Sequence, residues 1–209
     1  KISVLMSVYN GDQFLKESID SIINQTFTDF EFIIINDGSN DDTLNILNSY
    51  NDKRIKIFNQ KNIGLTKSLN RGLEYCSTEF IARMDSDDIS HPDRLYIQFE
   101  KFKDKELVLL GSRTNFLTSG SYKESKYYTN EELKNKLKIS NPFSHSSVMF
   151  RKSNFLSIGG YNEKFKLGQD FDAWRRLSEI GKISMVNLIL VTIRIHNKSI
   201  GRRKVFLQA

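Results

Sequence analysis

At residues 80–88 the chain reads Phe80-Ile81-Ala82-Arg83-Met84-Asp85-Ser86-Asp87-Asp88, an apolar run of strand length that ends in three carboxylates within four residues. Carboxylates gathered at one point repel one another and are costly to desolvate unless a cation lies beside them. Mg²⁺ and Mn²⁺ are bound by such oxygen ligands and keep open positions for substrate phosphates. The alternative interpretation is an acidic loop that caps the following helix. The stretch alone does not separate these two interpretations.

The flanking sequence alternates between strand and helix patterns. Near-continuous apolar runs at residues 2–8, 30–35 and 107–110 are typical of strands covered on both faces. Residues 54–58 alternate between apolar and polar and predict a strand near the edge of a sheet. Apolar residues at helical spacing predict helices at about 14–25, after a cap among residues 39–42, at 65–75, and from Pro92 to about 102. Four such alternations predict an α/β fold, a mostly parallel sheet with helices on both faces.

The pattern is weaker after residue 112. It predicts a hairpin around Ser119–Ser121 and then, in order, a helix at 131–137, a strand at 147–150, helices at 153–158 and 169–180, and two closing strands between residues 183 and 195. We therefore expect a single domain over residues 1–209, with a regular half at 1–112 and a smaller mixed half at 113–209.

Composition excludes several classes of protein. The formal net charge is +6, but the basic clusters are too short for a nucleic-acid-binding arm, so no nucleic-acid partner is expected. One cysteine excludes a disulfide framework and a multi-thiolate metal site. No apolar run reaches the length of about 18 residues that a membrane-spanning helix needs. The positive charge would suit an anionic nucleotide or an anionic membrane face.

Polar side chains follow three of the predicted strands. Tyr9 and Asn10 come after the first strand, Asn36-Asp37-Gly38 after the second, and Asp85–Asp88 after the fourth. Open parallel sheets bind ligands at the carboxyl ends of their strands, so these side chains are expected to line one site. The chain has no G-x-G-x-x-G after the first strand and no Walker lysine loop. A nucleotide would then be held through its base and ribose, with a metal ion on the diphosphate.

Taken in order, the motifs resemble those of family 2 glycosyltransferases of the GT-A fold. They are Ser7-Val8-Tyr9-Asn10, Ser18-Ile19-Asp20-Ser21-Ile22-Ile23-Asn24-Gln25-Thr26, Ile34-Ile35-Asn36-Asp37-Gly38-Ser39, Asn62 with Gly64, Asn70 with Gly72, Ala82–Asp88, His91-Pro92-Asp93-Arg94-Leu95, His145-Ser146-Ser147, Gly159-Gly160-Tyr161 and Gln169-Asp170-Phe171-Asp172-Ala173-Trp174. The resemblance covers nearly the whole chain. Each motif is weak alone, but the ordered set is specific.

This resemblance implies an inverting, non-processive transferase of the bacterial surface-glycan type. Such an enzyme moves one sugar from a nucleoside-diphosphate sugar, with UDP favoured, to a hydroxyl of a glycan, lipid-linked or protein-linked acceptor. It also implies that residues 1–112 bind the nucleotide sugar and that residues 113–209 bind the acceptor and carry the catalytic base. The expected place is the cytoplasm or the inner face of the membrane, with peripheral membrane association.

The resemblance assigns the donor-binding residues one by one. Asp37 matches the aspartate that hydrogen-bonds the base, and Tyr9 lies beside that base. Asp85 and Asp87 match the D-x-D motif, with Asp85 near the ribose and Asp87 on the metal-bound diphosphate. From the residues alone, Asp37 could instead cap the second helix.

The metal and the base are assigned in the same way. The expected cofactor is Mn²⁺ or Mg²⁺. Asp87 or its neighbour Asp88 is the direct metal ligand, and His196 matches a position that reaches the metal in some relatives. Asp170 matches the catalytic base, although an acid in the first turn of a helix is also favoured by the helix dipole.

One departure from the family pattern is Gln169, where the commonest version of the base motif has Glu. The Q-x-x-R-W motif of polymer-building relatives is absent, which favours transfer of one sugar per binding event. Two alternative functions remain: a nucleotide-sugar-binding module without turnover, and a sugar nucleotidyltransferase. The latter would need a glycine-rich, arginine-containing loop where this chain has Tyr9-Asn10-Gly11-Asp12.

Overall fold

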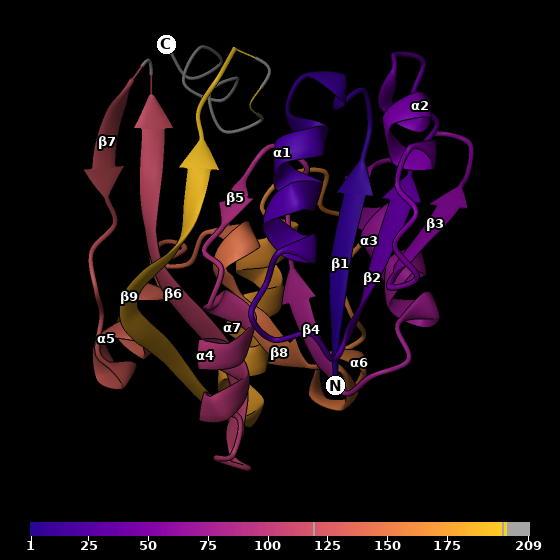
Figure 1. Ribbon diagram of the computed structural model, residues 1–209. Helices are drawn as coiled ribbons and strands as arrows, with labels where there is room; N and C mark the ends of the chain where they lie inside the picture. The colour runs from indigo at the N-terminus through magenta and orange to yellow at the C-terminus, as the bar shows by residue number, and fades with distance from the viewer. Residues whose placement is uncertain (119, 198, 200–209) are drawn as a thin grey trace, which may run out of the picture.

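The computed structural model describes residues 1–118, 120–197 and 199 (Figure 1). Within this described part, nine strands form one mixed sheet in the order β3-β2-β1-β4-β8-β6-β9-β5, with β7 paired to β6. Helices cover both faces of the sheet, so the predicted α/β fold is confirmed. No helix in the described part of the chain is long and apolar enough to cross a membrane.

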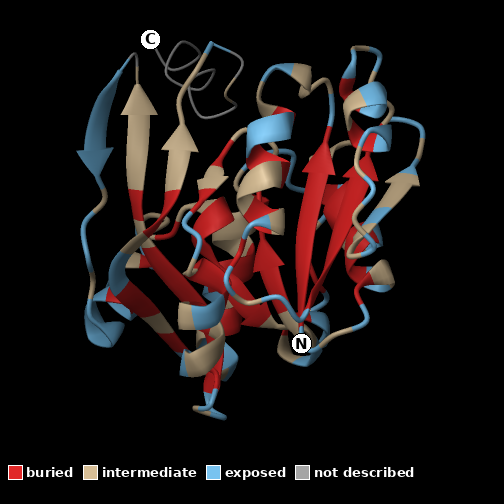
Figure 2. Ribbon diagram, viewed as in Figure 1, coloured by how far each residue is buried: buried red, intermediate tan, exposed pale blue. Residues whose placement is uncertain are grey.

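The first half of the chain supplies the parallel part of the sheet. β1 (Ile2–Val8), β2 (Phe30–Asn36), β3 (Ile55–Asn59) and β4 (Phe80–Arg83) run parallel to one another. β1 and β2 are buried along their whole length, as their continuous apolar sequences predict (Figure 2). β3 is partly exposed at the edge of the sheet, which confirms the prediction from its alternating sequence.

The helices divide between the two faces. One face carries α1 (Asp12–Ile23), α2 (Thr43–Asn48) and α4 (Arg94–Lys101), which contribute apolar side chains to one core cluster. The other face carries α3 (Leu65–Tyr75), α5 (Asn130–Lys136), α6 (Lys152–Ser157) and α7 (Gln169–Ile180), around the fully buried Trp174. In Figure 1, α1 and α4 lie in front of the sheet and α7 lies behind it.

The second half closes the sheet. β6 (Leu107–Thr118) and β9 (Lys182–Arg194) pair parallel to each other, and β7 (Ser121–Glu124) folds back on β6 as the predicted hairpin. β8 (Met149–Arg151) follows a 3₁₀ turn at His145–Ser147 and lies antiparallel between β4 and β6. β5 (Ile89–Ser90), which the sequence pattern did not predict, pairs with β9.

Two sequence predictions about this half are wrong. One strand, β9, replaces the two predicted closing strands, and β6 continues to Thr118 and not only to Leu110. The two strands pair along their length. The local sequence pattern suggested a break in β9, but the structure has shifts of register next to Arg113 there, and the strand continues.

The start of α4 also differs from its prediction. The helix begins at Arg94 with Asp93 as its N-cap, and not at Pro92. The carbonyl of Pro92 accepts a hydrogen bond from the Thr26 backbone (2.9 Å), so it is tied to the loop after α1 and is not part of the helix.

Candidate active site

The carboxyl ends of β1, β2 and β4 surround a cavity of about 620 Å³. Among the predicted site residues, those that line it are Tyr9, Asp37, Asp85, Asp87 and His196. Asp88 and Asp170 do not line it. A second cavity of about 420 Å³ lies between α4, β6 and β9 and contains none of the predicted site residues.

Asp37 shapes the wall of the cavity nearest β3. Its side chain is buried at the end of β2, where Oδ1 accepts hydrogen bonds from Gln60 Nε2 (2.7 Å) and the Ile63 backbone (2.9 Å). Oδ2 accepts one from the Gly64 backbone (2.9 Å). Asp37 therefore orders the loop that enters α3, and the alternative that it caps α2 is wrong, because the N-cap of α2 is Asp42. Tyr9 lies at the end of β1 with its side chain half exposed.

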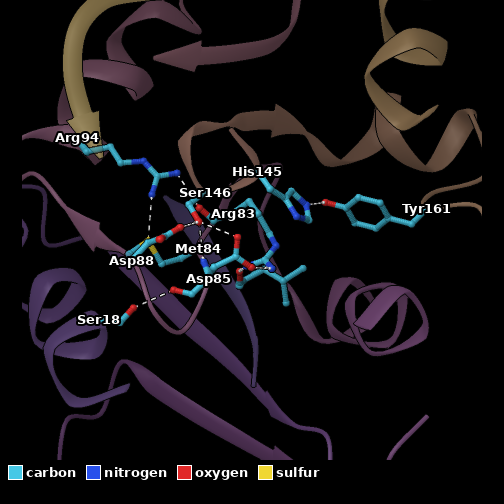
Figure 3. A network of polar contacts seen from close by, with 10 residues as sticks. Ser18, Arg83, Met84, Asp85, Asp88, Arg94, His145, Ser146 and Tyr161 are labelled. Atoms are coloured by element: carbon cyan, nitrogen blue, oxygen red, sulfur yellow. Dashed lines mark hydrogen bonds and ion pairs between the residues drawn. The ribbon is translucent and has the colours of Figure 1, made fainter. Parts of the chain in front are cut away.

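Figure 3 shows the polar network around Asp85. The buried Arg83 guanidinium pairs with Oδ1 of Asp85 and donates to the carbonyl of Leu5 (3.3 Å). Ser146 Oγ donates to Oδ2 of Asp85 (2.9 Å) and accepts a hydrogen bond from its backbone N–H (3.0 Å). Burial alone would raise the pKa of Asp85, but the charge of the Arg83 guanidinium outweighs it, and the pKa lies below its ordinary value. Asp85 is thus an ionised carboxylate held in one orientation.

Asp88 faces the interior of the protein. It is 3% exposed, its Oδ2 contacts Ser146 Oγ, and its Oδ1 accepts a hydrogen bond from the Arg194 backbone (3.0 Å). Burial, followed by repulsion from Asp85 and Asp87, raises the pKa of Asp88 well above its ordinary value. The position of Asp88 does not support the prediction that it binds a metal ion. It ties the turn after β4 to the end of β9.

The guanidinium of Arg94 also holds the chain at the end of β4 in place. It is fully buried and donates to the carbonyls of Arg83 (2.8 Å) and Val148 (3.1 Å) and to Gln98 Oε1 (3.0 Å). Burial and the nearby Arg83 lower the pKa of Arg94 below its usual range. This residue fixes the end of β4 against the strand that follows the 3₁₀ turn.

Asp87 and His196 meet inside the cavity. Oδ2 of Asp87 and Nε2 of His196 are 2.9 Å apart, and both side chains are partly exposed, at 31% and 20%. Burial and the neighbouring Asp85 raise the pKa of Asp87, and contact with His196 opposes that rise. Two ligands at right angles on an Mg²⁺ or Mn²⁺ ion, each about 2.1 Å from it, lie about 3 Å apart. The pair therefore fits one divalent ion. No larger group of His, Cys, Asp or Glu suited to a metal occurs among the residues that the structure describes.

Arg194 holds the end of β9 so that His196 reaches the cavity. Its guanidinium lies over the ring of Phe14 (4.3 Å to the centroid) and pairs with Glu17 on α1 (2.6 Å). The ring of Phe14 also lies beside that of His196, with centroids 4.8 Å apart. The segment that carries His196 is thereby fixed to α1.

Asp170 lies in the first turn of α7, and its Oδ2 accepts a hydrogen bond from Asn141 Nδ2 (2.7 Å). The partly buried His145 lies beside Tyr161, with its Nε2 2.9 Å from Tyr161 Oη. Burial, followed by the charge of Arg83, lowers the pKa of His145 to about 4, so its imidazole is neutral at neutral pH.

Several of these residues had no role in the sequence analysis. Asn141 stands in no motif, and no pattern in the sequence points to it. Ser146 and Arg83 belong to motifs, but only the fold brings them onto Asp85. Asp172, two residues after Asp170, has a structural role, because it forms an ion pair with Arg176 (2.7 Å).

Known proteins resemble this chain in sequence. Residues 3–158 match the family described as Glycosyl transferase family 2, a match that ends before Asp170 and His196. The chain is 38% identical to the O-antigen biosynthesis glycosyltransferase WbnJ of Escherichia coli, over 95% of this chain and 81% of the relative. It is 30% identical to the hyaluronan synthase of Pasteurella multocida, over 99% of this chain and 22% of the relative.

Solved structures share the fold. TarS of S. aureus in complex with UDP-GlcNAc superposes with a TM-score of 0.79 at 20% identity, over 95% of this chain and 60% of that one. The mannosyltransferase PcManGT of Pyrobaculum calidifontis, in complex with GDP-Man and Mn²⁺, superposes with a TM-score of 0.77 at 13% identity, over 98% of this chain and 59% of that one. This chain therefore spans about three fifths of each of these two solved chains, the first of which is residues 1–349 of TarS.

Proposed function

This chain belongs to glycosyl transferase family 2, and we propose that it is an inverting enzyme that transfers one sugar from a nucleoside-diphosphate sugar to an acceptor hydroxyl. UDP is the favoured nucleotide, and the acceptor is a glycan, free or linked to a lipid or protein. The observation that carries the proposal is the cavity in which Tyr9, Asp37, Asp85, Asp87 and His196 converge. The ligands of TarS and PcManGT, UDP-GlcNAc and GDP-Man with Mn²⁺, support a donor of this class.

Asp37 and Tyr9 would hold the base. A carboxylate oxygen has two acceptor positions, and Oδ2 of Asp37 accepts one hydrogen bond within the protein, from Gly64. The remaining position can accept the imide N–H of uracil, and the half-exposed ring of Tyr9 can lie against the base. Asp85, whose carboxylate is held by Arg83 and Ser146, would accept a hydrogen bond from a ribose hydroxyl.

Asp87 and His196 would hold the divalent ion, with substrate oxygens as further ligands. Such an ion, when bound, supplies positive charge next to the departing diphosphate. Asp88 would keep the turn in place without touching the ion, because its side chain is buried and does not line the cavity.

The transfer needs one proton acceptor. The acceptor oxygen forms a bond to the anomeric carbon on the side opposite the diphosphate, while the bond from that carbon to the diphosphate oxygen breaks. The hydroxyl proton passes to the carboxylate of Asp170, and the nucleoside diphosphate leaves with the bonding electrons. Asn141 keeps Oδ2 of Asp170 engaged, so that Oδ1 can face the acceptor.

Thermal unfolding with UDP, GDP or dTDP, each with and without Mn²⁺, tests the donor site. A ligand at a hundredfold excess over its dissociation constant stabilises by about 2.7 kcal/mol, which raises the Tm of a domain of this size by about 5–10 °C. We expect this rise with UDP and Mn²⁺ together, and its loss in Asp87→Ala. Asp29→Ala, an exposed acid away from the cavity, is the matched control and should behave as wild type. If no nucleotide shifts the wild type, the donor assignment fails.

A further inference from the structure

Two exposed loops lead into the hydrogen bond between Asn141 and Asp170. One follows α5 and carries Ile139, which is 82% exposed. The other precedes α7 and carries Phe165 and Leu167, which are 41% and 44% exposed. A residue spans at most about 3.6 Å of extended chain, so Ile139 lies within about 7 Å of Asn141 and Leu167 within about 11 Å of Asp170 along the backbone. Large exposed apolar side chains therefore lie a few residues from each partner of this hydrogen bond.

Lysines alternate with these apolar side chains. Lys164 and Lys166 flank Phe165, and Lys138 precedes Ile139, all of them exposed. None of these lysines forms an ion pair with another described residue. The acid in these loops, Glu163, accepts a hydrogen bond from Asn70 (3.1 Å). The lysine charges are therefore available to an external anion.

Hydrogen bonds and core contacts hold the two loops that carry these side chains in place. The carbonyl of Phe165 accepts a hydrogen bond from Thr66 Oγ1 (3.0 Å), and Asn70 Nδ2 donates to the carbonyl of Tyr161 (2.8 Å), which ties this loop to α3 at two points. On the other side, Leu133 and Leu137 anchor α5 in the same core cluster as α7. The apolar side chains are thus held outward by ordered backbone.

These side chains do not line either of the two cavities described above. They form an outer surface, so a small ligand enclosed by the protein would not cover them. A free glycan is also a poor match for exposed Ile and Leu, because sugars are held mainly by hydrogen bonds. Apolar side chains interleaved with lysines are typical of surfaces that lie in the headgroup region of a bilayer, with the lysines on lipid phosphates.

We propose that this rim, defined as Lys138, Ile139, Lys164, Phe165, Lys166 and Leu167, docks on an anionic phospholipid bilayer. Docking there turns Asp170 toward acceptors carried in that bilayer. The docking itself rests on the rim alone, whereas its meaning for the acceptor rests on the role of Asp170 proposed above.

Co-sedimentation with vesicles tests the docking. Wild-type protein is mixed with vesicles of phosphatidylglycerol and phosphatidylcholine, or of phosphatidylcholine alone, at low and high salt. We expect binding to the anionic vesicles that weakens as the salt concentration rises, because the Debye length falls to about 3 Å at 1 M salt. Each lysine replaced by Gln should weaken binding by about fivefold, and the triple variant Ile139→Ser/Phe165→Ser/Leu167→Ser by at least about tenfold.

The controls replace exposed aromatic and apolar side chains by Ser, or exposed lysines by Gln, at positions outside the rim. They are Tyr96→Ser/Tyr122→Ser/Leu156→Ser for the apolar set and Lys53→Gln/Lys105→Gln/Lys123→Gln for the lysines. The proposal is overturned if wild type does not bind anionic vesicles, if the rim variants bind as wild type does, or if the controls lose as much. The UDP-dependent rise in Tm should be unchanged in the rim variants. Vesicle binding without that rise would leave the rim standing and reject the donor site.

Discussion

The three carboxylates after β4 have three different environments within four residues. Asp85 is paired with a buried guanidinium, Asp87 meets His196 in the cavity, and Asp88 is engaged at both oxygens inside the protein. The pKa is lowered for Asp85 and raised for the other two, since only Asp85 has a cation close enough to outweigh burial and repulsion. Adjacent positions in one motif can therefore have separate tasks.

For Asp170, we predict that substitution by Asn removes turnover and leaves donor binding intact. The carboxamide oxygen introduced there can still accept the hydrogen bond from Asn141, but it cannot take the proton of the acceptor. The rate of nucleoside-diphosphate release should fall by about 10²–10⁴, with an unchanged UDP-dependent rise in Tm. Asp172→Asn, which weakens an ion pair with Arg176, should keep most of the rate. A variant Asp170→Asn with wild-type rates would reject this residue as the base.

Glu31, at the opposite end of the sheet, affects stability and not the site. Burial alone would raise its pKa, but hydrogen bonds from Lys56 (2.7 Å), Ser3 (2.6 Å) and the Ser77 backbone (2.6 Å) lower it to about 2. A lowered pKa stabilises the folded state above the ordinary value of 4.5, and this contribution is lost as the pH falls from about 4.5 to about 2.

We therefore predict that Glu31→Gln costs about 1–2 kcal/mol of unfolding free energy at pH 7, because the half-exposed Lys56 is screened by solvent and the Gln amide oxygen still accepts from Ser3 and Ser77. In urea titrations, the difference from wild type should narrow as the pH falls toward 2. Glu100→Gln, at a partly exposed position on α4, should change stability by less than about 0.5 kcal/mol. A difference in unfolding free energy between Glu31→Gln and wild type that does not change with pH would contradict this account.

Among the elements, α3 depends on close contact with the strands beneath it. A Cβ at Gly72 would lie 2.4 Å from Leu5 Cδ1 and 3.1 Å from Ile35 Cγ1, both in buried side chains of β1 and β2. Gly→Ala inside a helix normally stabilises by about 1 kcal/mol, whereas overpacking a core costs about 1–3 kcal/mol.

The net result that we predict for Gly72→Ala is a loss of about 1 kcal/mol, the reverse of the helix-propensity effect. Urea titration would measure it. Lys67→Ala, on the exposed side of the same helix, should be neutral within about 0.5 kcal/mol. Stabilisation by Gly72→Ala would mean that α3 can move away from the sheet at little cost.

In the molecule as a whole, the two halves of the chain interlock. β8 lies between β4 and β6, and β5 from the first half pairs with β9 from the second. Removal of residues 113–209 would leave the edge of β4 unpaired and take away half of the core that Trp174 organises.

We predict from this interlocking that the chain unfolds as a single domain. Calorimetry should give one transition with equal calorimetric and van't Hoff enthalpies, and a fragment of residues 1–112 should be unfolded. Two separable transitions, or a folded fragment, would show that the halves are independent domains.

Local sequence was sufficient for the elements whose pattern repeats within a few residues. The bounds of β1, α3 and α7 agree with their predictions, because continuous apolar runs and helical spacing reflect burial along one element. The ordered motifs were also sufficient for the family. The partners of Asp88 could not be predicted in this way, since Ser146 and the Arg194 backbone lie 58 and 106 positions along the chain. The insertion of β8 and the unbroken length of β9 could not be predicted either. Strand pairing joins segments that are far apart in the chain, and the sequence of one segment does not indicate its partner.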